Sequence, residues 1–192
     1  MKNRISTILC LALFSVSLNA QNTVSGTINC LDGNPIAIDG VTIELIAASG
    51  TVQTTSPDGN GEYEFLNVAS NEDYTLHIEA DDPAIYGITT YDLVLIVQGI
   101  LNPPFDNPFL ILAADVNLSG SVSTLDLVLL RQLILFIVTD LPGPTWRFAT
   151  EDFDYDPPSG FVNDIPIVDL QSDIVINLVA VKVGDVSGNA CN

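Results

Sequence analysis

Basic residues and histidine are scarce in this 192-residue chain. It holds five Lys and Arg residues against 24 Asp and Glu residues, and His77 is the one histidine. Such an acidic chain repels nucleic acid and anionic membranes, so neither is expected as a partner. With one histidine, no Cys–His pair of clear spacing and no glycine-rich phosphate loop, nucleophilic and phosphoryl chemistry lack their usual residues. We therefore expect a protein that is not an enzyme.

Cysteine is also rare, with three residues in the chain. Cys10 lies in an apolar leader, which leaves Cys30 and Cys191 in the remainder. Two cysteines are too few for a disulfide framework, although in an oxidising compartment they could pair. The sequence leaves open whether they do.

A long apolar run that could span a membrane is missing too. Residues 1–20 combine Lys2 and Arg4 with an apolar core over residues 5–18 and a Leu-Asn-Ala ending, which predicts a secretory signal peptide. A membrane span needs about 20 apolar residues, more than this core provides. We expect export to the cell exterior or cell surface, with no membrane insertion after signal cleavage. Only Arg131, Arg147 and Lys182 then oppose the acidic residues, so the exported chain should attract divalent cations.

Residues 21–80 show the alternation of an antiparallel β-sandwich. Apolar and polar residues alternate between turns rich in Gly, Asn, Asp and Pro, which predicts short strands. The predicted strands cover residues 23–29, 41–47, 51–55, 62–67 and 74–79.

A twelve-residue stretch, residues 115–126, has the layout of a calcium loop. Oxygen-bearing side chains stand at loop positions 1, 3, 5, 9 and 12, Gly120 stands where the backbone turns sharply, and position 7 offers its carbonyl. Ca²⁺ takes about six to eight oxygen ligands, which this spacing supplies from one segment. The alternative is a surface turn before a helix capped by Ser123 or Thr124. The predicted calcium ligands are Asp115, Asn117, Ser119, Ser121, Ser123 and Asp126.

The segment that follows this loop has a counterpart upstream. Residues 90–101 match residues 124–135 at eight of twelve positions, and both stretches are predicted to be helices. A duplicated loop and helix cannot bury its apolar face alone, so the two copies should pack together. The upstream loop, residues 81–92, is degraded: Pro83 and Ile85 stand at ligand positions, and Tyr86 stands where glycine belongs. The sequence leaves open whether that loop binds calcium.

This duplicated unit, over residues 81–140, resembles the dockerin type I module. The resemblance implies a small, mainly α, EF-hand-like module with bound Ca²⁺ that docks to a cohesin-like protein or another surface or secreted protein. In dockerins, loop positions 10 and 11 help to choose the partner. The matching positions here are Thr124 and Leu125, with Thr90 and Tyr91 in the upstream copy.

The β-rich region carries a second resemblance, in the order of Val24-Ser-Gly-Thr-Ile, Gly40-Val-Thr-Ile-Glu-Leu and Asp58-Gly-Asn-Gly-Glu-Tyr-Glu-Phe. It is similar to the prealbumin-like repeats of bacterial surface proteins and to the regulatory domain of carboxypeptidases. Most relatives are spacers, and some related folds bind carbohydrate. The local aromatic residues Tyr63, Phe65 and Tyr74 stand at strand spacing, which favours a place in the core over sugar stacking.

The expected architecture is mixed, with two domains. A prealbumin- or Ig-like β-sandwich, residues 21–80, precedes a mainly α calcium module, residues 81–140, and an acidic, loop-rich tail with a terminal strand, residues 141–192. The tail includes a stretch at residues 185–189 that begins like a further calcium loop. The expected function is calcium-dependent attachment or assembly in polysaccharide-degrading or cell-surface complexes. The alternatives are carbohydrate binding through the sandwich and a calcium-stabilised spacer within a longer surface protein.

Overall fold

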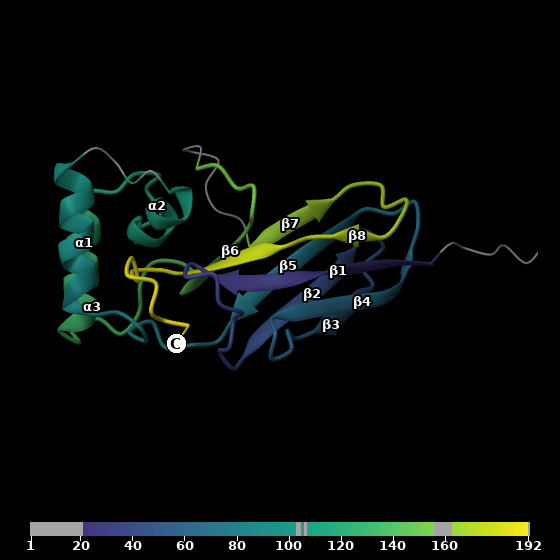
Figure 1. The fold of residues 1–192 in the computed structure, drawn as a ribbon, viewed down its shortest axis with the longest axis horizontal. Helices are drawn as coiled ribbons and strands as arrows, with labels where there is room; N and C mark the ends of the chain where they lie inside the picture. The colour runs from purple at the N-terminus through teal and green to yellow at the C-terminus, as the bar shows by residue number, and fades with distance from the viewer. Residues whose placement is uncertain (1–20, 103–104, 106, 156–162, 192) are drawn as a thin grey trace, which may run out of the picture.

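The computed structural model describes residues 21–102, 105, 107–155 and 163–191. The predicted signal peptide, residues 1–20, lies outside the described residues. The described chain is mostly β, with nine strands and three short helices (Figure 1). The elements are β1 (Gln21–Cys30), β2 (Val41–Ala47), β3 (Val52–Thr55), β4 (Glu62–Ala69), β5 (Tyr74–Ala80), α1 (Thr90–Leu101), α2 (Pro108–Ala114), α3 (Thr124–Ile134), β6 (Trp146–Thr150), β7 (Asp164–Ile167), β8 (Ile174–Val175) and β9 (Leu178–Lys182).

The strands form two sheets that draw on both ends of the chain. One has the order β4-β1-β9-β6, with β8 also paired to β1, and the other has the order β3-β2-β5-β7. The early strands pair antiparallel, as their alternation predicts, whereas β8 and β9 run parallel to β1. Parallel neighbours require a crossover connection, and the segment that contains the three helices lies between β5 and β6.

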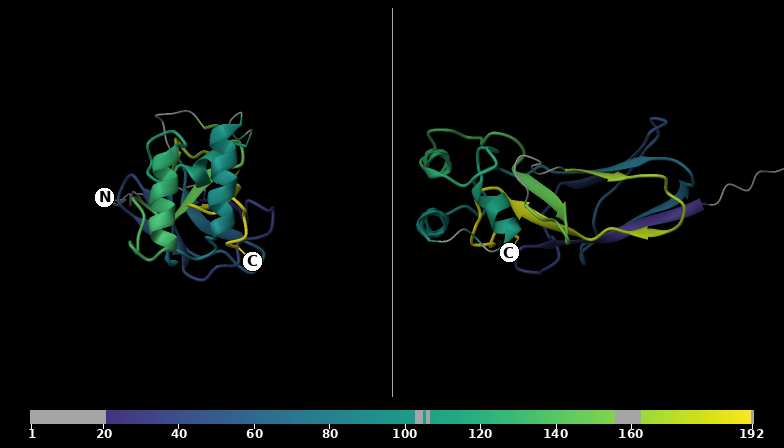
Figure 2. Two further views of the ribbon diagram at one scale, coloured as in Figure 1. Left: turned by 90° about the vertical axis from the view of Figure 1, so that its left-hand side faces the viewer. Right: turned by 90° about the horizontal axis from the view of Figure 1, so that it is seen from above.

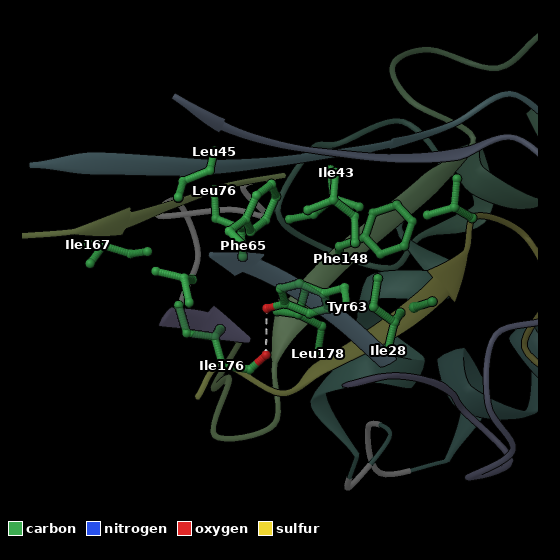
Figure 3. Close-up of a cluster of buried hydrophobic side chains, with 14 of the residues drawn as sticks. Ile28, Ile43, Leu45, Tyr63, Phe65, Leu76, Phe148, Ile167, Ile176 and Leu178 are labelled. Carbon is green, nitrogen blue, oxygen red and sulfur yellow. Dashed lines mark hydrogen bonds between the residues drawn. The ribbon is translucent and has the colours of Figure 1, made fainter. Parts of the chain in front are cut away.

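A single apolar core joins the two sheets. In β2, for example, the odd-numbered residues from Val41 to Ala47 are buried and the residues between them are half-exposed. Figure 3 shows Ile43, Leu45 and Leu76 of one sheet facing Phe65 and Leu178 of the other. The Tyr63 hydroxyl donates a 2.7 Å hydrogen bond to the Ile176 carbonyl, so this buried phenol has a polar partner.

The three helices gather at one end of the sandwich. Figure 2 shows α1 and α3 side by side across that end, and β1 begins at the opposite end. Their inner residues, such as Ile96, Leu130 and Leu133, are buried in a second apolar cluster. This cluster also contains Ala149 of β6, Val181 of β9 and the following Val183. The helices α1–α3 with their connecting loops are called the helical cap below.

The structure corrects the expected mixed, two-domain fold class. A small, mainly α module is not seen. The three helices, of 12, 7 and 11 residues, each bury one side in a cluster that includes strand residues from the C-terminal third of the chain. Helices this short draw most of their stability from such packing. The fold is a mostly β chain with a helical cap.

The C-terminal region also differs from a loop-rich tail. Strands β6, β7, β8 and β9 complete both sheets, and β9 pairs with β1 on one side and β6 on the other. A disulfide joins Cys30 at the end of β1 to Cys191, with the two Cα atoms 6.3 Å apart. The cysteine pairing that the sequence left open is therefore present, and it ties the end of the chain to the first strand.

Candidate functional site

Two helix ends position the predicted calcium loop. Asp115 is the C-terminal cap of α2, and Ser123 is the N-terminal cap of α3. Ser123 and Asp126 form a capping box. The Ser123 hydroxyl accepts a hydrogen bond from Leu125 N, and the Asp126 carboxylate accepts one from Ser123 N. Between the caps, Leu118 (φ +59°) and Gly120 (φ +79°) adopt left-handed backbone conformations that fold the loop back on itself.

The carboxylate of Asp115 lies inside the loop and is almost fully buried. Its Oδ1 accepts a hydrogen bond from Ser119 N at 3.0 Å, and its Oδ2 accepts from Gly120 N at 2.8 Å. Oδ2 also accepts from the Tyr155 hydroxyl at 3.1 Å. The loop backbone is therefore wrapped around this carboxylate.

The carboxylate of Asp126 closes the loop from the other side and is fully buried. Its Oδ1 accepts from Asn117 N at 3.1 Å, and its Oδ2 accepts from Ser123 N at 2.8 Å. The two carboxylates therefore hold neighbouring parts of the loop backbone, Asp115 at residues 119 and 120 and Asp126 at residues 117 and 123. Within the loop, the Ser119 hydroxyl donates to the Ser121 carbonyl at 3.0 Å.

The residues brought together make an all-oxygen donor set. It holds two carboxylates, the Asn117 amide oxygen, two serine hydroxyls and the Ser121 carbonyl, and it suits a hard cation such as Ca²⁺. Within the described ranges, no group of three or more His, Cys, Asp or Glu side chains could hold a metal. A cation in this loop would therefore depend on its neutral oxygens as much as on its carboxylates.

Two residues beside the loop, Arg147 and Tyr155, carry no motif that marks them in the sequence. Arg147 of β6 is fully buried and donates from Nη1 to the Leu112 carbonyl and from Nη2 to the Asp115 carbonyl, the latter at 2.8 Å. Burial lowers the pKa of Arg147 to about 10, and the charge of Asp115 opposes that change. Burial, followed by the charge of Asp115, raises the pKa of Tyr155 to about 12. The one available signal was that Arg147 is a rare basic residue in an acidic chain.

The four residues at the predicted partner positions are all exposed. Thr90 and Tyr91 begin α1, and Thr124 and Leu125 begin α3. Further along α1 and α3, including the C-terminal cap of α3, large apolar side chains are also exposed. We call the exposed apolar residues of the two helices the helix-pair face: Tyr91, Val94, Val97, Leu101, Leu125, Val128 and Leu135.

The upstream loop, residues 81–92, lacks the geometry of residues 115–126. Asp81 lies against Gly40 at the start of β2, and Pro83 and Ile85 bring no side-chain oxygen. Asp92, however, is fully buried in a capping box with Thr89 that matches the one between Asp126 and Ser123. The helix end of the upstream loop is therefore intact, and its first half is not.

The sandwich offers little for stacking on a sugar. Tyr63, Phe65 and Tyr74 are 3%, 3% and 7% exposed, in agreement with the prediction that they belong to the core. Across the described residues, no helix has the length and apolar character needed to cross a membrane.

Comparisons with protein-family models, with curated proteins and with solved structures find no match for this chain. The resemblances to dockerins and to prealbumin-like domains therefore remain predictions from the quoted motifs.

Proposed function

We propose that this chain is an exported, non-catalytic attachment protein in which Ca²⁺ bound at residues 115–126 orders the helical cap for binding to a partner protein. The observation that carries the proposal is the pair of buried carboxylates, Asp115 and Asp126, closed into one loop with four further oxygen donors. Buried charges in proteins are paired or coordinate metals.

The helix-pair face supports the second part of the proposal. Both helices lie wholly within the described chain, and their acidic residues, Asp92 and Asp126, are buried. The exposed side of the pair is therefore apolar and free of acidic side chains, in a chain with 24 acidic residues, and Arg131 is exposed on α3. Contiguous exposed apolar surface commonly marks a protein-binding site. The partner we propose is a folded protein that presents an apolar patch, at the end of the sandwich away from Gln21.

Calcium would connect the two features through Asp126. This residue closes the loop and also caps α3, so neutralising its charge would stabilise the loop and the start of the helix together. Since α1 packs against α3, order at the loop would fix the relative position of the two helices that a partner contacts.

Thermal unfolding tests the calcium site directly. The chain from Gln21 onward is melted with excess Ca²⁺ and with chelator, next to Asp115→Ala/Asp126→Ala. We expect Ca²⁺ to raise the Tm of the wild type and to leave the Tm of the double variant unchanged. Asp39→Ala/Glu79→Ala, two exposed acids of the sandwich region, is the matched control and should keep the calcium response. An equal Tm in Ca²⁺ and in chelator for the wild type would reject the site.

A pull-down from the secreted fraction of the source organism tests the partner. Wild-type protein should retain a partner in Ca²⁺ and release it in chelator, and Tyr91→Ser/Leu125→Ser should not retain it. A glycan array is the third arm of the test. Sugar binding without a calcium-dependent protein partner would favour the carbohydrate-binding alternative, and neither kind of binding would favour a spacer.

A further inference from the structure

The loop at residues 115–126 buries two negative charges. Asp115 is 3% exposed and Asp126 is 0% exposed, and the hydrogen bonds that their carboxylates accept come from backbone N–H groups and from hydroxyls. These donors are neutral, so they reduce the cost of burying the two charges without cancelling the charges themselves. Positive charge from elsewhere in the chain would reduce that cost further.

Arg147 of β6 brings a positive charge to the loop. It is 0% exposed, and its Nη2 donates to the carbonyl of Asp115 at 2.8 Å while its Nη1 donates to the carbonyl of Leu112. Burial lowers the pKa of Arg147 to about 10, and the charges of Asp115 and Asp126 are among those that oppose this change. The guanidinium therefore stays protonated at neutral pH, and it lies within electrostatic reach of both carboxylates.

This charge is carried by the sandwich and not by the loop. Arg147 lies in the middle of β6, opposite Val181 of β9, in the sheet that also contains β1. Because the backbone of Arg147 is fixed by this strand pairing, its side chain remains beside the loop whether or not an ion is bound there.

The other basic side chains in the described part of the chain lie elsewhere or are already engaged. Arg131 is exposed on α3, where solvent and salt screen its charge. Lys182 Nζ donates to Asp82 Oδ2 at 2.7 Å, and His77 belongs to β5 of the sandwich. Arg147 is thus the buried basic residue that contacts the loop.

We propose that the buried charge of Arg147 regulates the loop at residues 115–126: it offsets part of the carboxylate charge before an ion binds, and it opposes the entry of a divalent cation. The proposal rests on the proposed binding of Ca²⁺ by this loop. The ion and the guanidinium compensate the same two carboxylates, so each reduces the benefit of the other, and this coupling is reciprocal. The loop then stays folded at low calcium, and its affinity falls toward the Kd of about 10⁻⁴–10⁻³ M that is typical of extracellular modules.

Calcium binding and thermal unfolding of two variants of Arg147 test this coupling. Arg147→Met removes the charge and keeps a long side chain, so it should bind Ca²⁺ at least about tenfold more tightly than the wild type. Its Tm should fall further below that of the wild type in chelator than in excess Ca²⁺. Kd is measured by isothermal titration, and Tm is measured for each protein in both conditions.

Arg147→Lys is the matched control, because it keeps the charge and loses the planar group that reaches two carbonyls. Its Tm should fall by the same amount in chelator and in Ca²⁺, and its Kd for Ca²⁺ should stay within about twofold of the wild-type value. A purely structural role of Arg147 predicts instead that both variants bind Ca²⁺ more weakly than the wild type.

The outcomes separate this proposal from the proposed function. A wild type that binds no Ca²⁺ would overturn both. A wild type that binds Ca²⁺, beside an Arg147→Met protein with equal or weaker binding, would overturn the regulation by Arg147 alone. Binding weakened about tenfold in Arg147→Lys would do the same, since the guanidinium would then act by holding Asp115 in place. An Arg147→Met protein that folds only with Ca²⁺ would support the coupling, and if it folds in neither condition the Kd of Arg147→Lys decides.

Discussion

The sandwich and the helical cap are stabilised in different ways, although strands β6 and β9 contribute to both. The core between the sheets consists of apolar side chains. In contrast, the helical cap and its junction with the C-terminal segment contain every buried charged side chain of the described residues: Asp92, Asp115, Asp126, Arg147, Lys182 and Asp185.

This difference means that metal ions should affect the stability of the two regions differently. The free energy gained by apolar burial does not depend on metal ions. The free-energy cost of burying four carboxylates, in contrast, falls when a cation binds them. In the proposed function, the sandwich serves as the support and the cap is the region that calcium would order. The predictions below test that division, beginning with the largest expected change in the free energy of unfolding.

Truncation of a core aromatic residue in the sandwich should have the largest effect. Phe65→Ala removes a side chain that is 3% exposed and packs edge-on against Tyr63, and it should lower the free energy of unfolding by about 3–5 kcal/mol. Urea unfolding should give the same loss with Ca²⁺ and with chelator. The neighbouring Leu66→Ala, at a position 55% exposed, should change stability by less than about 0.5 kcal/mol. A loss that depended on Ca²⁺ would contradict the division.

Removal of the disulfide should rank next. Cys30→Ser/Cys191→Ser opens a covalent link across 161 residues, and loss of such a link costs about 2–5 kcal/mol. The same loss should appear when the wild type is unfolded under reducing conditions. Unchanged stability would show that the C-terminal segment is held without it.

Calcium removal should loosen the cap and spare the sandwich. An ion present at 100 times its Kd stabilises the bound state by about 2.7 kcal/mol, which corresponds to roughly 100-fold in local opening. Hydrogen exchange should therefore accelerate in α1 and α3 on chelation, by up to that factor, and remain unchanged in β2 and β5. Equal acceleration in both regions would mean that sandwich and cap unfold as one unit.

Changes on the helix-pair face should have the smallest effect on stability. Tyr91→Ser/Leu125→Ser alters side chains that are 60% and 54% exposed, so the free energy of unfolding should change by less than about 0.5 kcal/mol per site. Partner retention should nevertheless be lost. Val175→Ser, at a position 68% exposed in the sandwich, is the control and should change neither property. A Tyr91→Ser/Leu125→Ser protein that keeps its partner would move the binding surface elsewhere.

Local patterns predicted the elements that depend on local physics. The five strands between residues 21 and 80 and the helices after residues 89 and 123 agree with the structure, because alternation and capping act over a few residues. Residues 115–126 fold into a closed loop around Asp115 and Asp126, and whether their six oxygen-bearing residues bind Ca²⁺ stays a prediction.

The expected fold class failed where partners lie far apart in the chain. Nothing in residues 164–182 shows that β7 pairs with β5 or that β9 runs parallel to β1, because register is set by the strands on either side. The same distance concealed the contact between residues 185–191 and the start of α1, where Ser187 N donates to Asp92 Oδ1.

The sequence alone determined the early strands, the helix starts and the closed loop at residues 115–126, since each depends on residues within about a dozen positions of one another. Tertiary structure decided that the helices cap a sandwich, that Cys30 reaches Cys191, and that Ser187 reaches Asp92. Those contacts span about a hundred residues or more, and only the packing of two sheets on a shared core brings their members together.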